Sequence, residues 1–182
     1  ALDYLNDTLK DFKYRFAYLF MPVHQGGGRA MVTLKKTAKI TSTKPLIKGK
    51  ILIYKVPMYH GTLKTNGYIF KKGNVVIAYL TDCNRIPKSS IEFIKSFGNI
   101  NHLIIDGLRE KHHSTHFSFS ESLEIADIIA AKHTWLTHIC HEKKHKDIQK
   151  WIDSHITNYP AQSKIIKKGG TVCPAYDGLI LE

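Results

Sequence analysis

The sequence predicts a mixed α/β domain, α/β (α+β) in class, in which helices pack against a sheet. Short apolar runs with strand periodicity recur along the chain, a few longer segments carry apolar residues at helical spacing, and turn signals separate them. The length of 182 residues suits one domain, and 43% hydrophobic with 23% charged residues is ordinary for a globular protein. We therefore expect residues 1–182 to form a single domain.

The first part of the chain predicts mainly strands. Three glycines at 26–28 mark a flexible turn among them. Farther along, Lys72-Gly73 is expected to turn a hairpin. The segments with strand character are Ala17–Pro22, Ala30–Thr33, Ala38–Thr41, Lys50–Met58, Gly67–Lys71 and Asn74–Leu80.

Helices and strands alternate in the second part. Ser89–Phe97 predicts a short amphipathic helix, and His102–Ile105 a buried strand. Phe119–Lys132 is the clearest helix, because Ser118 and Glu121 fit a capping box ahead of an apolar stripe. The remaining predicted elements are a strand at Thr134–Thr137, a helix at Lys144–Ile156, and strands at Ile165–Lys167 and Gly178–Leu181.

The net charge of +12 comes from 27 Lys and Arg against 15 Asp and Glu. A basic surface attracts polyanions, so the charge mildly supports an anionic substrate. The lysine pairs are spread along the chain, which is more typical of a solvated surface than of a dedicated nucleic-acid face. RNA therefore stays open as a partner.

The sequence also bears on the cellular location of the protein and on the redox state of its cysteines. No apolar run approaches the length of a membrane span, and no charged-then-apolar signal opens the chain. Three widely spaced cysteines (Cys83, Cys140, Cys173) form neither a disulfide framework nor a zinc motif by themselves. We expect a cytoplasmic protein with reduced thiols and no membrane partner.

Several apolar strands end on residues that can bind a metal. His60 ends one such run, Asp82 another and Asp106 a third, while His138 and His141 follow a fourth. Because strand ends meet at one edge of a sheet, ligands scattered in sequence can converge in space. Imidazoles with a hard carboxylate suit Zn²⁺, Mn²⁺ or Fe²⁺. The pattern favours a metal site over isolated structural histidines, although periodicity alone does not decide it.

These residues carry a family resemblance that covers nearly the whole chain from about Phe16. The sequence resembles the second half of the metallo-β-lactamase superfamily, and most closely the branch of the phosphoribosyl cyclic phosphodiesterases (PhnP-like). Seven pieces match in order and spacing: MYHG at 58–61, NGYIF at 66–70, AYLTD at 78–82, LIIDGLR at 103–109, STHFSFSESLEIA at 114–126, LTHICHE at 136–142 and AYDGLIL at 175–181.

The resemblance implies an αββα sandwich with two divalent metals, Zn or Mn, at one edge of its sheets. It makes His60 a ligand of the first metal, Asp82 the bridge between both metals and His138 a ligand of the second. His116 matches a histidine that lies over the metals and exchanges a proton with the substrate, or hydrogen-bonds a phosphate oxygen.

Two further residues keep alternative interpretations. In that branch, the position of His141 closes a structural zinc site with upstream cysteines; a surface or second-shell histidine is the other interpretation. Asp177 matches a residue that orients a ligand histidine, or is simply a turn residue before Gly178. Asp106 is expected to fix local backbone rather than to bind metal. His112 and His113 lie in a loop that can approach the substrate.

The H-x-H-x-D-H signature of the superfamily, which supplies most of the metal ligands, is not among these 182 residues. We therefore expect the chain to be the C-terminal portion of the fold, with the native protein continuing upstream. By itself, this chain is expected to hold an incomplete metal site and to be inactive.

Three functions remain open from the sequence. The leading one is a phosphodiesterase acting on a small cyclic or nucleotide-like phosphodiester. A second is a tRNA 3′-processing endonuclease of the same superfamily, although no insertion resembling its basic tRNA-binding arm is visible. A third is a non-catalytic module that binds nucleic acid or a protein partner. A homo-oligomer is compatible with all three.

Overall fold

The computed structural model describes residues 3–21, 32 and 40–181, and divides the chain into two compact units, residues 1–38 and 39–182. The first unit contains α1 (Asp3–Arg15) and a 3₁₀ turn, η1 (Ala17–Leu19). The strand predicted at residues 17–22 is therefore wrong. Phe12, Phe16 and Phe20 recur at helical spacing, with ring centroids 4.9 and 6.2 Å from that of Phe12, and this clustering favours a helical course. The predicted strands at 30–33 and 38–41 lie mostly outside the described residues.

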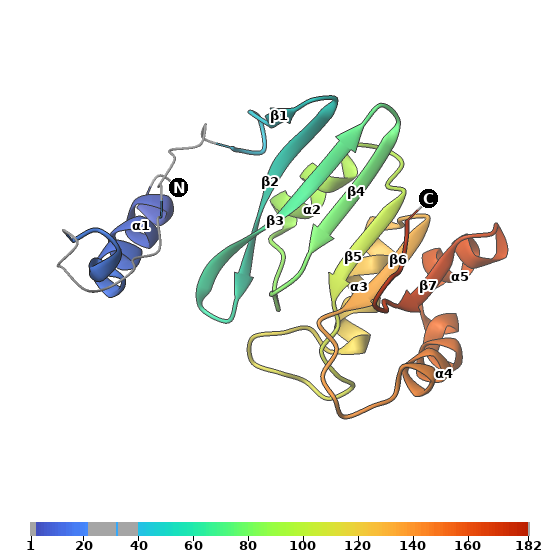
Figure 1. Ribbon diagram of the computed structural model, residues 1–182. Coiled ribbons are helices and arrows are strands. Elements are labelled where there is room, and N and C mark those ends of the chain that lie inside the picture. The colour runs from blue at the N-terminus through green and yellow to red at the C-terminus, as the bar shows by residue number, and fades with distance from the viewer. Residues whose placement is uncertain (1–2, 22–31, 33–39, 182) are drawn as a thin grey trace. The chain divides into compact units, whose positions relative to one another are not determined.

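The second unit is built on one seven-stranded sheet whose strands follow each other in space as they do in sequence (Figure 1). Neighbouring strands are antiparallel from β1 to β4 and parallel from β4 to β7. The strands are β1 (Leu46–Lys48), β2 (Ile51–His60), β3 (Leu63–Lys72), β4 (Val75–Leu80), β5 (His102–Asp106), β6 (His133–Thr137) and β7 (Thr171–Pro174).

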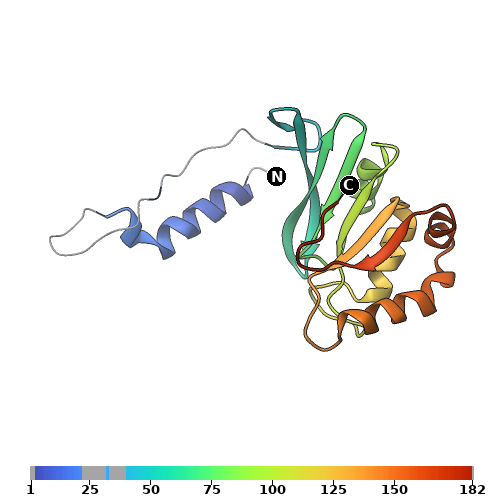
Figure 2. The ribbon, with the colours of Figure 1, turned by 45° about the vertical axis from the view of Figure 1, so that its right-hand side comes forward.

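The helices of this unit lie on one face of the sheet (Figure 2). Each parallel crossover from β4 to β7 advances in the same direction, and right-handed crossovers then place their helices on the same side. The helices are α2 (Lys88–Lys95), α3 (Phe119–Ile129), α4 (His145–His155) and α5 (Pro160–Lys167), with a 3₁₀ turn η2 (Ile156–Asn158) before α5. The mixed α/β class is confirmed.

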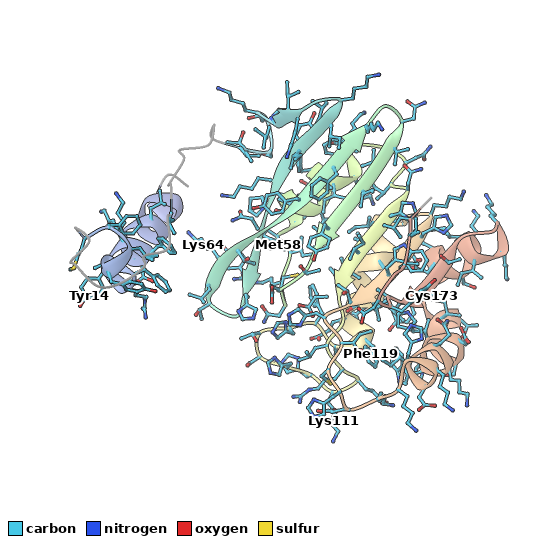
Figure 3. All side chains as sticks on the ribbon, in the orientation of Figure 1. Tyr14, Met58, Lys64, Lys111, Phe119 and Cys173 are labelled. Atoms are coloured by element: carbon cyan, nitrogen blue, oxygen red, sulfur yellow. The ribbon has the colours of Figure 1, made fainter. Side chains whose placement is uncertain are left out.

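The core lies between this face and the helices. Alternate strand residues such as Met58 and Leu80 are buried against it, and Phe119 at the start of α3 is 1% exposed; Figure 3 labels Met58 and Phe119. The capping box predicted at the start of α3 is present, since the Ser118 hydroxyl accepts from the Glu121 amide and the Glu121 carboxylate accepts from the Ser118 amide.

The opposite face of the sheet carries half-exposed aromatic and aliphatic side chains. Tyr68 lies beside Tyr79, and Phe70 beside Ile77, in the register of β3 with β4. No helix among residues 40–181 covers this face. The segment that follows β7 crosses part of it (Figure 1), and a hollow of about 200 Å³ there is lined by Ile104, Trp135, Ala175, Tyr176, Leu179 and Leu181. Residues 40–181 thus supply one sheet and one helical layer of the expected sandwich.

Two C-terminal predictions are wrong. Residues 165–167 end helix α5 instead of forming a strand, and residues 178–181 form neither helix nor strand. The last strand is β7, at residues 171–174. In addition, no helix in the described part of the chain is both long and apolar enough to cross a bilayer.

Candidate metal centre and active site

Five strands of the sheet, β2 and β4 to β7, point the same way, because β3 is antiparallel to both β2 and β4, and the strands from β4 to β7 are parallel to one another. Their C-terminal ends therefore meet at one edge, the lower edge in Figure 1. His60 is the last residue of β2, Asp82 follows β4 by two residues, Asp106 ends β5 and His138 directly follows β6. Ligands are commonly found at this edge of parallel sheets.

Asp82 and His138 share an unusual backbone conformation. Their φ angles are 54° and 61°, in the left-handed region that non-glycine residues seldom occupy. Such strain is concentrated at functional sites, where the surrounding structure holds it in place. The bend turns both side chains toward each other, and Asp82 Oδ1 lies 3.0 Å from His138 Nε2. Their side chains are 61% and 39% exposed, so solvent or a ligand can reach them.

His116 comes to the same edge on the loop of residues 107–118, between β5 and α3. Its Nε2 atom lies 3.1 Å from Nε2 of His60. The His116 ring stacks on that of His138, with centroids 4.5 Å apart and planes inclined by 21°, and meets the His60 ring edge-on. Three imidazoles from three separate segments are thus in direct contact.

Asp106 holds His116 from behind. Its side chain is fully buried, and Oδ2 accepts hydrogen bonds from His116 Nδ1 at 2.8 Å and from the Cys83 amide at 3.0 Å. Burial raises the pKa of Asp106, while the hydrogen bonds from His116 and Cys83 oppose that rise. With its Nδ1–H donated to Asp106, neutral His116 presents an unprotonated Nε2 to the site.

Asn84 ties together the loops that carry these side chains. Its Oδ1 accepts from the Gly61 amide next to His60, and its Nδ2 donates to the Ser114 carbonyl in the His116 loop, both at 2.8 Å. Asn84 itself lies two residues after Asp82. The sequence offered no signal for this role, because the contacts span 23 and 30 residues. The role of Asp106 toward His116 was also missed, although its place at a strand end was noted.

The donor set suits a divalent metal ion. One group comprises His60, Asp82 and His116, and a second Asp106, His116 and His138, each with ligand atoms within 4.8 Å of one another. Imidazole nitrogens with a carboxylate oxygen are the ligands that Zn²⁺ and similar ions take in proteins. Beside these groups is a pocket of about 270 Å³, lined by His60, Leu63, Lys64, Thr65 and Asp82. Lys64, which is labelled in Figure 3, lines the pocket from strand β3.

His141 and Asp177 are not brought into this cluster. Both are exposed turn residues, His141 before α4 and Asp177 after β7. Among the hydrogen bonds and ion pairs of the described residues, none joins either side chain to His60, Asp82 or His138. Their suggested roles, a structural metal site and a second-shell contact, stay predictions.

The order of the elements and the residues at the sheet edge can be compared with known proteins. Residues 5–139 match the beta-lactamase superfamily domain. This chain belongs to the beta-lactamase superfamily. No curated protein matches it.

Solved structures show the metallo-β-lactamase fold directly. A diphosphatase of the PhnP family is 28% identical, with a TM-score of 0.67 over 96% of this chain and 55% of its own. The metallo-β-lactamase fold protein YhfI from Bacillus subtilis is 20% identical, with a TM-score of 0.58 over 77% of this chain and 53% of its own. The diiron β-hydroxylase CmlA from Streptomyces venezuelae is 13% identical, with a TM-score of 0.54 over 76% of this chain and 33% of its own. This chain therefore spans about half the length of the first two.

Proposed function

We propose that this chain supplies part of the active centre of a metal-dependent hydrolase, which cleaves a cyclic or nucleotide-like phosphodiester. The observation that carries the proposal is the convergence of His60, Asp82 and His138 on one sheet edge, beside a histidine whose ring is held by a buried carboxylate. The likeness to a PhnP-family diphosphatase at 28% identity supports phosphate chemistry over other reactions of the superfamily.

Each side chain has a distinct task in the proposed reaction. His60 and His138 would each help to hold one divalent ion, Zn or Mn, and Asp82 would help to hold both. Such ions activate a water molecule and neutralise charge on the phosphate when bound. His116, protonated at Nε2, would give its proton to the leaving oxygen, and Asp106 would stabilise the imidazolium through Nδ1–H.

The basic composition, at +12, and the cation of Lys64 in the pocket wall are compatible with an anionic substrate. The polar rim of the pocket, with Thr65 beside Lys64, offers hydrogen bonds to the same group. A precursor tRNA would present many phosphates to the same surface, whereas a small phosphodiester needs only the pocket.

The test compares three substrates on the complete protein, meaning this chain with any upstream segment of the native polypeptide. We expect metal-dependent hydrolysis of bis(p-nitrophenyl) phosphate and of a cyclic phosphate, abolished by a chelator and restored by Zn²⁺ or Mn²⁺. Cleavage of precursor tRNA alone would favour the endonuclease. Absence of cleavage with all three, in metal-loaded protein, would contradict the proposal and favour a binding module.

A further inference from the structure

His113 lies three residues before His116 on the same loop, yet its imidazole is held in the opposite tautomer. Its Nδ1 accepts a hydrogen bond from the Thr115 amide at 3.3 Å and lies 3.2 Å from the Thr115 hydroxyl. A backbone N–H can only donate, so Nδ1 of His113 carries no proton and the proton of the neutral ring is on Nε2. In His116, by contrast, the proton is on Nδ1, which donates to Asp106.

The two rings are neighbours, with centroids 5.3 Å apart and planes inclined by 39°. His116 in turn touches His60 and His138, so His113 forms the outer member of the histidine group. The His113 side chain is half-buried, and no described residue hydrogen-bonds its Nε2. The proton on Nε2 thus has no acceptor among the described residues, on a ring that packs against His116 of the proposed active site.

The environment of His113 favours its neutral form. Partial desolvation lowers its pKa, and the charge of Arg109, together with that of neighbouring histidines whenever they are protonated, lowers it further. His112 is different, because its ring is 74% exposed and its Nδ1 lies 3.0 Å from the Glu121 carboxylate. His112 and His113 therefore have different environments, although nothing in the sequence distinguishes the two adjacent histidines.

We propose that Nε2–H of His113 donates a hydrogen bond to a non-bridging phosphoryl oxygen of the substrate, which makes His113 a further catalytic residue. This proposal rests on the proposed phosphodiesterase function. A phosphoryl oxygen has only lone pairs to offer, so it requires a donor, and the Nδ1 bond to Thr115 keeps that donor on Nε2. Hydrogen bonds to charged oxygens contribute about 1.5–3 kcal/mol, which corresponds to about 10- to 100-fold in binding or rate.

Three substitutions of His113 separate the contribution of its Nε2–H donor from that of the rest of the imidazole ring. The amide nitrogen of Gln reaches the place of Nε2, whereas that of Asn lies near Nδ1. In the complete protein we expect His113→Ala and His113→Asn to lower kcat/KM for bis(p-nitrophenyl) phosphate by about 10- to 100-fold. His113→Gln should stay within about threefold of wild type, and the neighbouring control His112→Ala within about twofold. A Gln variant as weak as the Ala variant, or an Asn variant as active as wild type, would overturn the proposal.

Imidazole ¹⁵N NMR gives a second readout that requires no turnover. We expect His113 to show an unprotonated Nδ1 and a protonated Nε2, and we expect added inorganic phosphate to shift the Nε2 resonance. The phosphate shift should be absent in His113→Asn and persist in His112→Ala. If the wild-type protein cleaves no phosphodiester, the proposed function fails, and the phosphate titration still decides the role of His113. A proton on Nδ1, or no response to phosphate, would contradict that role.

Discussion

His116 is the residue whose side chain joins the separate parts of the site. Its Nδ1 is bonded to Asp106, its Nε2 faces His60, and its ring stacks on His138. A group in this position can transfer a proton without being needed to hold a metal. Activity and metal content should therefore respond differently to its removal.

We expect His116→Ala to lower kcat by about 10²–10⁴-fold, the usual range for the loss of a general acid or base. Metal content should remain nearly unchanged. The measurement is steady-state kinetics with metal analysis on the same preparation. A loss of one metal equivalent would instead make His116 a ligand and refute the proton-transfer role.

Asp106 acts on the reaction through His116, as a positioning residue. Asp106→Asn keeps an acceptor for one of the two bonds that Oδ2 now accepts, but removes the negative charge behind the imidazole. We expect kcat to fall by about 10- to 100-fold, as for other residues that orient functional side chains, with KM little changed. A rise in KM by the same factor with kcat unchanged would point to a structural role only. So would a variant whose circular dichroism shows that it no longer folds.

The sequence identified most of these residues but not how they connect. Each of His60, Asp82 and His138 ends or follows an apolar strand, which makes it a candidate ligand, and the structure brings the three side chains close together. Asp106 was interpreted as fixing local backbone, which its bond to the Cys83 amide confirms. Its bond to His116 and the bridging role of Asn84 depend on the course of the loop at 107–118. Loop conformation has no periodic pattern in sequence, so these contacts could not be predicted.

At the scale of elements, the loop that carries His116 is anchored by the start of α3. Ser118, two residues after His116, is the N-cap, and Glu121 accepts from both its amide and its hydroxyl. Partial desolvation raises the pKa of Glu121, but hydrogen bonds from Ser118 and the contact with His112 together outweigh it, so the pKa is lowered. The helix end and the site loop are thus one hydrogen-bonded unit.

Ser118→Ala should reduce the free energy of unfolding by about 1 kcal/mol, because it leaves an α3 amide without its side-chain acceptor. Denaturant unfolding monitored by circular dichroism measures the change. The matched control is Ser89→Ala on α2, an exposed serine for which we expect about zero. Equal effects at both positions would show that the cap contributes nothing specific.

Helices and strands are predicted best where the apolar pattern is long and a turn or a capping residue marks its end. The hairpin of β3 and β4 and helix α3 were confirmed, because alternation or a capping box marked them. The short apolar group at 165–167 predicts a strand, yet Pro160 opens a helix that runs through it. A segment of three or four residues is too short to show periodicity, which is also why β7 at 171–174 is not among the predicted strands.

At the scale of the whole molecule, the proposed metal ligands in this chain are too few for two metals. They are His60, Asp82 and His138, whereas one catalytic zinc commonly takes three protein ligands and water. The face of the sheet that carries Tyr68, Phe70 and Tyr79 is also uncovered by helices within residues 40–181, and Tyr79 is 41% exposed. Exposed apolar patches promote association.

We therefore expect the 182-residue chain by itself to bind at most one divalent ion, weakly, to show no phosphodiesterase activity and to self-associate. Equilibrium dialysis with Zn²⁺, an assay on bis(p-nitrophenyl) phosphate and light scattering check the three parts. Two tightly held ions with measurable turnover would mean that other residues of this chain complete the site.

The residues at the edge formed by β2, β4 and β6 are proposed to hold the metals, with Asp82 shared between the two ions. The most direct test is the metal content, by plasma emission, of Asp82→Ala in the complete protein beside wild type. We predict two divalent ions in wild type and the loss of at least one in the variant, because a bridging carboxylate neutralises two cations. Hydrolysis should be abolished in a variant that still folds. Two tightly bound ions and near wild-type turnover in Asp82→Ala would contradict the assignment.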